Sequence, residues 1–341
     1  MRSLDLKKYL IYFIIFLTVI FIIPAICTQK TVKNNNTGKK ESETTQEEQI
    51  KTYDYSKYAK IKLYHTDTEK IEELPIDEYI YGTVSAEMPA KYDLEALKAQ
   101  AIVSRTYTLY QIINGKNKHG EAGVCDDYNC CQAWISKEDR LNKWDEKERQ
   151  SNWDKIVKAV DSTSGMIITY NNEPIDAFFH SNSGGKTEVV SNVWGGKDLP
   201  YLKSVETSGE DGYSQYSSEV TLSKDELESK IKEKHSDFKI DWNEKECIKI
   251  NEYTDSGRVK TIKFGNIEIA GTEARTLLNL KSTNFTFKID KDNIIFSVTG
   301  YGHGVGMSQT GADSMAKSGS NYDEIIKHFY SGVEITYVNE L

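Results

Sequence analysis

The 341-residue chain has no block of basic residues, and its 43 Lys and Arg are outnumbered by 52 Asp and Glu, which gives a formal net charge of −9 at pH 7. Proteins that bind nucleic acid present a basic patch or stripe to the phosphates. The charge pattern therefore argues against a nucleic-acid partner. No Gly-Lys-Ser/Thr follows the glycine-rich stretch at 300–306, so this stretch is not typical of a phosphate-binding loop.

Cysteine is scarce, but three of the five cysteines fall close together beside one of only six histidines. These residues are His119, Cys125, Cys130 and Cys131. One neutral imidazole and three thiolates would form a closed tetrahedral zinc site, which is structural because no position stays open for water. A disulfide involving Cys125 is the main alternative in an exported protein, and free thiols are the third. We predict structural zinc here, and no cofactor for catalysis.

The N-terminal segment contains a run without any charged residue at 9–26, which is about the length of a membrane-spanning helix. Arg2, Lys7 and Lys8 precede the run, so the N-terminus is expected in the cytoplasm and the rest of the chain outside it. A cleaved signal peptide is the alternative. The apolar run is long for a signal peptide and no Ala-x-Ala site follows, so a retained single-pass anchor in the cell membrane is favoured.

Composition also predicts the order of domains. The segment 28–51 is polar and nearly free of apolar residues, which favours a flexible tether between the anchor at 1–27 and the body. The body spans 52–341, with 206–295 as a smaller β-rich part. The fold class expected is α+β, with a helical hairpin packed against mixed or antiparallel β-structure and an N-terminal transmembrane anchor.

Two helical patterns meet at Glu87. The upstream pattern has apolar residues at helical spacing, at Ile76, Tyr79, Ile80 and Val84. Pro89 disfavours the helical state for the residue before it, so the first helix is expected to end near Glu87. Asp93 is a good N-cap for the second helix. The short break predicts an antiparallel pair of helices with Glu87 at the joint.

A carboxyl group at a helix C-terminus faces the negative end of the helix dipole, which favours its protonated form and suits a general acid. Along the second helix, Lys98 is the nearer cation, Gln100 lies at the flank, and Arg105 reaches Glu87 only if the first helix folds back along the second. The alternative is that Glu87 only caps the helix or forms a salt bridge.

Two later stretches combine glycines with polar residues, at 180–205 and 300–312. Glycine lets the backbone approach a ligand closely, and polar loops directly after a buried strand often carry sites. For His180 and His303 a purely structural role, in a hydrogen bond to a backbone carbonyl or in a tight turn, is the alternative.

The stretches at 85–107, 180–205 and 300–312 together resemble the stage II sporulation protein D (SpoIID) family of peptidoglycan lytic transglycosylases, and the resemblance covers most of 52–340. It implies that Glu87 is the catalytic acid/base. The family usually has Tyr at the position of Thr310 and often Trp near Tyr301, so the chain departs from the pattern there. The resemblance and the helix positions predict a substrate groove lined by Lys98, Gln100, Arg105, His180, Ser181, Tyr201, Lys203, His303, Ser308, Gln309 and Tyr330.

The resemblance implies cleavage of glycan strands between MurNAc and GlcNAc to give 1,6-anhydroMurNAc ends, in remodelling of the septal wall and engulfment during sporulation. Such a reaction needs one carboxylate, and the resemblance assigns this role to Glu87. Implied partners are a SpoIIP-like amidase and a membrane protein such as SpoIIM, with the body facing the septal space from the mother-cell membrane. The alternatives are a non-catalytic enhancer of a partner amidase and a zinc amidase that uses His180 and His303.

Overall fold

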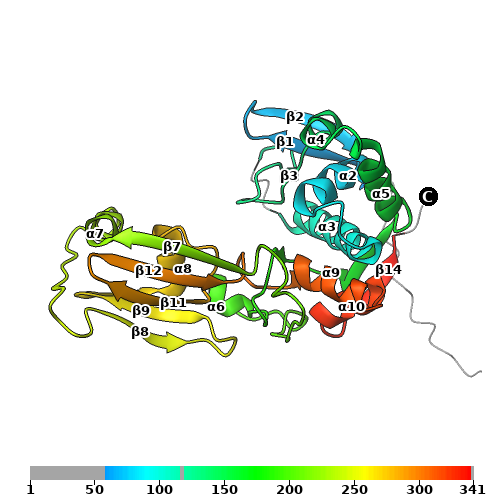
Figure 1. Ribbon diagram of the computed structural model, residues 1–341. Helices are drawn as coiled ribbons and strands as arrows, with labels where there is room; N and C mark the ends of the chain where they lie inside the picture. Colours follow the sequence, from blue (N-terminus) through cyan, green and yellow to red (C-terminus); the bar gives the residue numbers. More distant parts are fainter. Residues whose placement is uncertain (1–57, 116–118, 339–341) are drawn as a thin grey trace, which may run out of the picture. The chain divides into compact units, whose positions relative to one another are not determined.

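The computed structural model describes residues 58–115 and 119–338 (Figure 1). Within these residues the fold is a mixed α+β arrangement of helices and several small sheets, which confirms the predicted class. The predicted anchor and the tether at 28–51 lie outside the described residues. Among the helices of the described part, none has both the length and the apolar character needed to cross a bilayer.

The predicted helical hairpin is formed by α2 (Ile76–Glu87) and α3 (Leu94–Asn114). The first helix ends at Glu87, and Asp93 caps the second by accepting a backbone N–H of its first turn, as predicted. An ion pair of 3.0 Å joins Arg105, in the middle of α3, to Asp77 at the start of α2. The second helix therefore returns antiparallel along the first.

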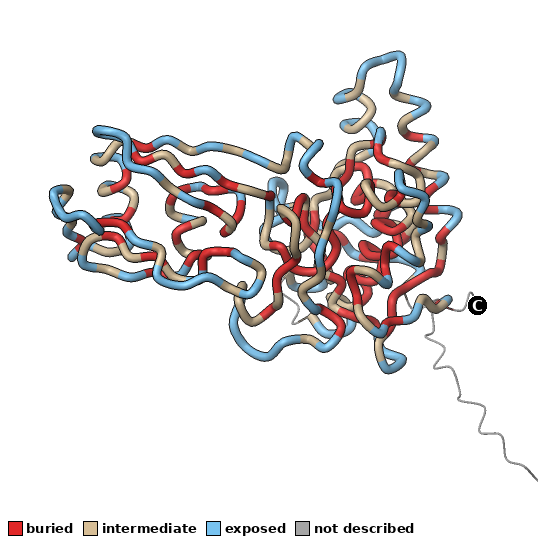
Figure 2. The backbone as a smooth tube through the Cα atoms, turned by 60° about the horizontal axis from the view of Figure 1, so that its bottom comes forward, coloured by how far each residue is buried: buried red, intermediate tan, exposed pale blue. Residues whose placement is uncertain are grey.

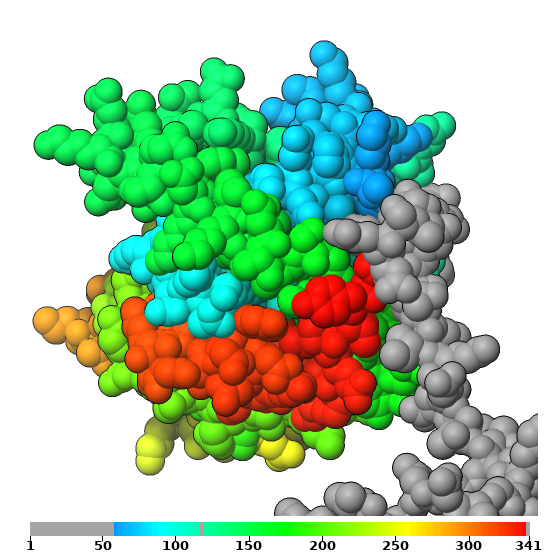
Figure 3. Space-filling model, turned by 90° about the vertical axis from the view of Figure 1, so that its right-hand side faces the viewer, coloured from blue at the N-terminus to red at the C-terminus, as the bar shows by residue number. Residues whose placement is uncertain are grey.

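The first of two hydrophobic cores surrounds α3, which is buried along most of its length. Helices α9 and α10, orange to red in Figure 3, pack beside α3, shown in cyan. Besides α2 and α3, the helices of this region are α4 (Lys137–Lys143), α5 (Arg149–Asp161), α6 (Val190–Trp194), α9 (Gln309–Lys317) and α10 (Tyr322–Phe329).

Three small sheets complete this core, with strand orders β2-β1-β3, β14-β4-β5 and β13-β6. The β1–β3 and β6–β13 pairs are parallel and the others are antiparallel, so the predicted mixture of pairings is confirmed. The strands are β1 (Lys60–His65), β2 (Lys70–Pro75), β3 (Val124–Cys125), β4 (Met166–Tyr170), β5 (Glu173–Pro174), β6 (Phe179–His180), β13 (Met307–Ser308) and β14 (Glu334–Tyr337).

The second core draws its buried residues from 222–298. Figure 2 shows buried segments both here and in the first core. Two antiparallel sheets, β11-β12-β7 and β10-β9-β8, share this core with two short helices. The elements are β7 (Ser217–Ser223), α7 (Lys224–Lys232), β8 (Ile248–Tyr253), β9 (Val259–Phe264), β10 (Ile267–Ala270), α8 (Gly271–Leu277), β11 (Phe285–Asp290) and β12 (Asn293–Thr299).

Buried polar contacts connect the loop between β8 and β9 to the glycine-containing stretch that follows β6. The guanidinium of Arg258 donates to the carbonyl oxygens of Ser183 (2.6 Å) and Lys186 (2.8 Å). The hydroxyls of Thr254 and Ser256 both donate to Glu188, each at 2.6 Å. Buried polar groups of this kind are expensive to leave unpaired, so these bonds fix the course of the stretch at 183–188.

Candidate active site

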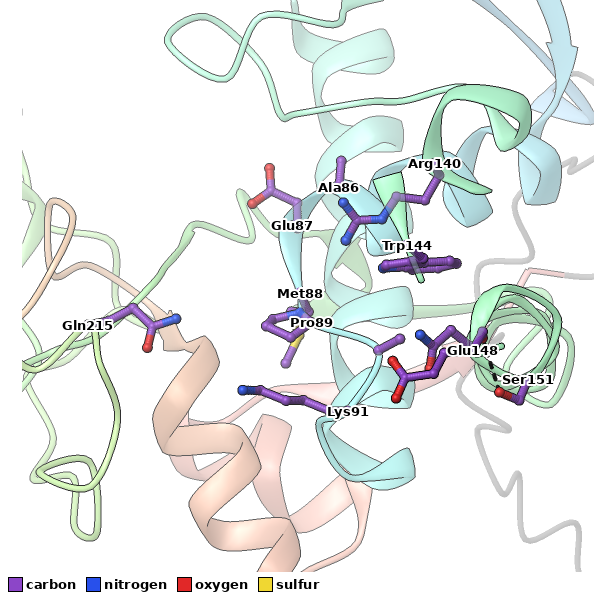
Figure 4. Close-up of a pocket in the computed structure, with 12 residues that line it drawn as sticks. Ala86, Glu87, Met88, Pro89, Lys91, Arg140, Trp144, Glu148, Ser151 and Gln215 are labelled. Carbon is purple, nitrogen blue, oxygen red and sulfur yellow. Dashed lines mark hydrogen bonds between the residues drawn. The ribbon is translucent and has the colours of Figure 1, made fainter. Parts of the chain in front are cut away.

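Glu87 lines a cavity of about 530 Å³ at the joint between α2 and α3 (Figure 4). The residues of the joint, 86–91, form one wall. The opposite wall comes from α4, from Trp144 at its C-terminal end, and from the first turn of α5. Gln215 also lines the cavity. A volume of several hundred Å³ is typical of sites for small molecules or sugar units.

Two hydrogen bonds hold the half-buried Glu87 carboxyl group. One oxygen accepts from the backbone N–H of Ala133 at 2.7 Å, and the other accepts from the side-chain amide of Gln309 at 3.2 Å. Burial raises the pKa of Glu87, and these two hydrogen bonds only partly offset it. A raised pKa keeps more of the group protonated, which is the state that a general acid requires.

The approach of the 133–135 segment to α2 depends on Gly82. A Cβ at this position would overlap the ring of Trp134 and lie 2.8 Å from the carbonyl oxygen of Ile135. Any larger residue would push the segment away from the helix. Gly82 therefore allows the N–H of Ala133 to reach Glu87 one and a half turns later along α2.

Glutamine side chains connect Glu87 to α3 and α9. The Gln309 amide that donates to Glu87 also lies 3.5 Å from the side-chain oxygen of Gln100. Gln100 in turn donates to the hydroxyl of Ser104 at 2.9 Å. Of the predicted groove residues, the structure thus brings Gln309 to Glu87 and Gln100 to Gln309.

The buried carboxylate of Glu210 organises the N-terminus of α9, where Gln309 lies. It accepts from the hydroxyls of Ser308, Thr310 (2.9 Å), Thr207 (2.6 Å) and Ser183 (2.5 Å), and from the N–H groups of 183 and 185. Burial alone would raise the pKa of Glu210, but these bonds outweigh it and lower the pKa to about 2. Ser308 also caps α9, so this predicted groove residue is committed to holding the helix in place.

Two cations of the predicted groove, Lys98 and Arg105, have protein partners in this structure. Lys98 forms an ion pair of 2.7 Å with Glu95 on the same helix. Arg105 is fully buried, bound to Asp77 and to the carbonyl oxygens of Thr163 and Met166. Asp77 lies ten residues before Glu87 on α2, a separation of about 15 Å. The structure therefore does not bring Arg105 to the cavity, and the guanidinium holds the helical hairpin together instead.

His180 and His303 pair with each other and not with Glu87. Their ring centroids are 5.6 Å apart, and neither lines the cavity. Nδ1 of the buried His180 donates to the carbonyl oxygen of Val305, while Nδ1 of His303 accepts from the Val305 N–H, both at 3.1 Å. Burial lowers the pKa of His180 to about 4, so the ring is neutral near pH 7. The Trp194 ring lies 4.9 Å from His303 and extends this cluster to the surface.

The other predicted groove residues are divided between core and surface. Tyr330 was expected to form a wall of the groove, but it is fully buried and donates to the carbonyl oxygen of Phe178 at 2.7 Å. Tyr201 is also buried, and its hydroxyl accepts from the N–H of Asp176. Ser181 accepts from the N–H of Thr310 through its carbonyl, and Lys203 is exposed.

His119, Cys125, Cys130 and Cys131 gather as the sequence predicts. Their ligand atoms lie within 4.8 Å of one another, and Nε2 of His119 is 3.4 Å from Sγ of Cys130. All three cysteines are free thiols in this structure. The ring of Tyr64 stacks on His119, and β3 places Cys125 beside Tyr64. This cluster could hold a metal ion.

Comparison with known proteins identifies the family. A family model described as Stage II sporulation protein matches residues 64–170. The chain is 33% identical to stage II sporulation protein D of Bacillus subtilis (strain 168), over 97% of this chain and 96% of that protein. The chain belongs to the stage II sporulation protein D family. It is also 34% identical to the protein of that name in Bacillus amyloliquefaciens, over 81% of this chain and 78% of that one.

Another relative of this SpoIID-family protein has a different name. The chain is 28% identical to the amidase enhancer of Bacillus subtilis (strain 168), over 75% of this chain and 40% of that protein. Its relatives therefore include proteins named for sporulation and a protein named as an amidase enhancer. Membership in the family supports a role in sporulation.

The cavity of this SpoIID-family protein also contains residues that the sequence analysis did not select, above all Arg140, Trp144 and Glu148. They come from a charged stretch with no motif. A signal was present, because Arg140 and Trp144 are four residues apart and such a pair shares one side of a helix. Glu148 is a second carboxylate in the cavity. In Figure 4 the carboxyl group of Glu87 points away from Glu148.

Proposed function

We propose that this protein is a lytic transglycosylase that cleaves peptidoglycan glycan strands between MurNAc and GlcNAc and leaves 1,6-anhydroMurNAc ends. Glu87 carries the proposal. It is a half-buried carboxyl group at the end of a helix, open to a cavity, with a pKa raised by burial. Family membership supports a sporulation role, which fits remodelling of the septal wall and engulfment.

In the proposed reaction, the Glu87 carboxyl donates its proton to the glycosidic oxygen as the bond from that oxygen to C1 of MurNAc breaks. The C6 hydroxyl of the same MurNAc then forms a bond to C1 and returns its proton to Glu87. No water is consumed, and Glu87 ends in its starting state. Hydrolytic glycosidases commonly use two carboxylates in fixed relation to each other, whereas this scheme uses one.

Mass spectrometry of products from purified glycan tests this proposal. Anhydro ends have a mass one water below that of hydrolytic ends. Hydrolytic ends would instead favour a glycosidase in which Glu148 activates water. The absence of any cleavage, together with faster turnover by an added amidase, would favour the enhancer function of the 28% identical relative.

A zinc amidase built on His180 and His303 receives less support. In the part of the chain that the structure describes, one group of three or more His, Cys, Asp and Glu residues has its ligand atoms close enough for a metal, and it is the cluster at His119. Neither His180 nor His303 belongs to it. We propose that this cluster binds structural zinc.

Two separations within the cluster support the zinc proposal. Two sulfur ligands at about 2.3 Å from a tetrahedral zinc ion lie about 3.8 Å apart, and a sulfur and a nitrogen lie slightly closer. The 4.0 Å between Cys130 and Cys131 and the 3.4 Å between Cys130 and His119 are close to these edges, and all four ligand atoms lie within 4.8 Å of one another. The ion would connect the ends of a loop, and its binding would add to folding stability.

We also propose that residues 9–26 anchor the protein in the mother-cell membrane with the body facing the septal space. This rests on the charge-free run and on the basic residues before it. A SpoIIP-like amidase and a membrane protein such as SpoIIM remain proposed partners. Co-purification of the intact membrane protein with each of them is the direct test.

A further inference from the structure

Arg140 has donors without acceptors at the edge of the cavity. Among the residues that the structure describes, none accepts a hydrogen bond from its guanidinium or forms an ion pair with it, and its Nε is buried without a partner. The two arginines that are most buried in the described part of the chain, in contrast, have protein acceptors. Arg105 and Arg258 each make several hydrogen bonds to carboxylate, hydroxyl or carbonyl oxygens. The side chain of Arg140 therefore has binding capacity that the fold does not use.

The position of Arg140 is nevertheless fixed. Its guanidinium carbon lies 4.8 Å from the centroid of the Trp144 ring, in a cation–π contact. Arg149 donates to the carbonyl oxygen of Trp144 at 3.1 Å, and Ser136 caps the helix that carries Arg140. Stacking occupies a face of the guanidinium, and among the described residues none accepts a hydrogen bond from its two terminal Nη groups. Figure 4 shows this group directed into the space between Trp144 and Glu87.

A guanidinium group with free N–H donors is well suited to bind a carboxylate. A guanidinium edge matches the two oxygens of a carboxylate and forms two parallel hydrogen bonds with it. The Arg140 side chain is partly withdrawn from water, and this burial lowers its pKa, with no anion among the described residues to compensate the charge. A carboxylate brought by a ligand would supply that compensation.

We infer that Arg140, stacked on Trp144, binds a carboxylate of the glycan and so positions the sugar for Glu87. This inference rests on the proposed function, since it takes peptidoglycan as the substrate class. Peptidoglycan offers such a group in two places, the lactyl substituent of muramic acid and the acidic residues of the stem peptide. The two sources share the chemistry, and the substrates below distinguish them.

Binding is measured in the Glu87→Gln background, so that the result does not depend on turnover. Three glycan preparations are titrated by calorimetry: one with stem peptides, one stripped of peptides so that its lactyl carboxylates are free, and the stripped glycan with those carboxylates converted to amides. Arg140→Gln is the test variant. Lys143→Gln is the control, because it removes the same charge from an exposed position of the same helix outside the cavity.

We expect Arg140→Gln to weaken binding about tenfold to a hundredfold, the range for a hydrogen-bonded charge pair. Loss on the stripped glycan, with no change on its amide, assigns the lactyl carboxylate. Loss confined to the peptide-bearing glycan assigns the stem peptide. The Glu87→Gln protein with Arg140 intact provides a further check, because its affinity for the glycan must fall when the recognised carboxylate is removed or amidated.

Two results would overturn the inference: affinities within about twofold of the background for all three glycans, or an equal loss on the amidated glycan, which would indicate a structural role. Arg140→Lys keeps the charge but not the paired donors, and we expect it to recover only part of the affinity. The products of the unmutated enzyme are measured separately. A failure of the transglycosylase proposal would therefore be visible as missing anhydro ends, whatever the binding data show.

Discussion

At the scale of single residues, Glu87 differs from an ordinary surface glutamate in having a fixed orientation and a raised pKa. We predict that Glu87→Ala lowers the release of anhydro-saccharides by about 10²- to 10⁴-fold, the usual cost of losing a general acid. Glu146→Ala, at an exposed carboxylate outside the cavity, is the control. A folded Glu87→Ala protein that kept more than about a tenth of the rate would rule out this role.

Gln309 should affect how the activity depends on pH. Its amide donates to Glu87 and stabilises the ionised form, so it lowers a pKa that burial raises. Gln309→Ala should therefore raise this pKa further. Because the acid must be protonated, activity falls as pH rises through the pKa, and we predict that the alkaline limb of the kcat profile moves to higher pH in the variant. An unchanged or downward-shifted limb would contradict this account.

Glu210 is a residue on which stability should depend. Its pKa of about 2 in the folded protein lies below the ordinary value near 4.3, so it contributes stability above pH 4 that is lost as pH falls toward 2. Two pKa units correspond to about 3 kcal/mol. We predict that Glu210→Gln lowers the free energy of unfolding by this order at pH 7 and by about half as much at pH 3.

Urea unfolding at both pH values measures the effect of Glu210→Gln. Glu206→Gln provides the control, because its side chain is 79% exposed. Equal losses for the Glu210 variant at the two pH values would show that the hydrogen bonds to its carboxylate do not favour the ionised form.

At the scale of elements, the parts predicted correctly are those governed by local rules. The end of α2 follows from Pro89 and the start of α3 from Asp93, since proline and capping effects act within a few residues. The position of Arg140 depends instead on how α4 packs against α2. Arg105 and Tyr330 illustrate the same limit, because a sequence motif does not distinguish a buried clamp from a groove wall.

The loop that carries the His119–Cys131 cluster continues directly to the active site, because Ala133, two residues after Cys131, donates to Glu87. We predict one zinc per chain, measured by elemental analysis of protein purified under reducing conditions. Chelation should lower the melting temperature, and Cys125→Ser should have the same effect, since either change removes a tie that closes the loop. No metal, with thiol counts that show a bridge, would assign the cluster to a disulfide.

At the scale of the whole molecule, both hydrophobic cores and the cavity are formed by residues within 58–338. The contacts that hold Glu87 come from segments as far apart as Ala133 and Gln309, so the site requires most of this span to fold together. The polar segment at 28–51 has few apolar side chains to add to either core. A body without the N-terminal segment should therefore fold by itself.

We predict that removal of residues 1–51 yields a soluble protein that still releases anhydro-saccharides, whereas the full chain fractionates with membranes. The physical reason is that the apolar run at 9–26 would supply the affinity for the bilayer, while the two hydrophobic cores of the described part of the chain are formed by residues after 58. Membrane fractionation and circular dichroism of the two proteins provide the measurement. Aggregation of the shortened protein, or loss of its cooperative unfolding, would show that residues before 52 contribute to the folded body.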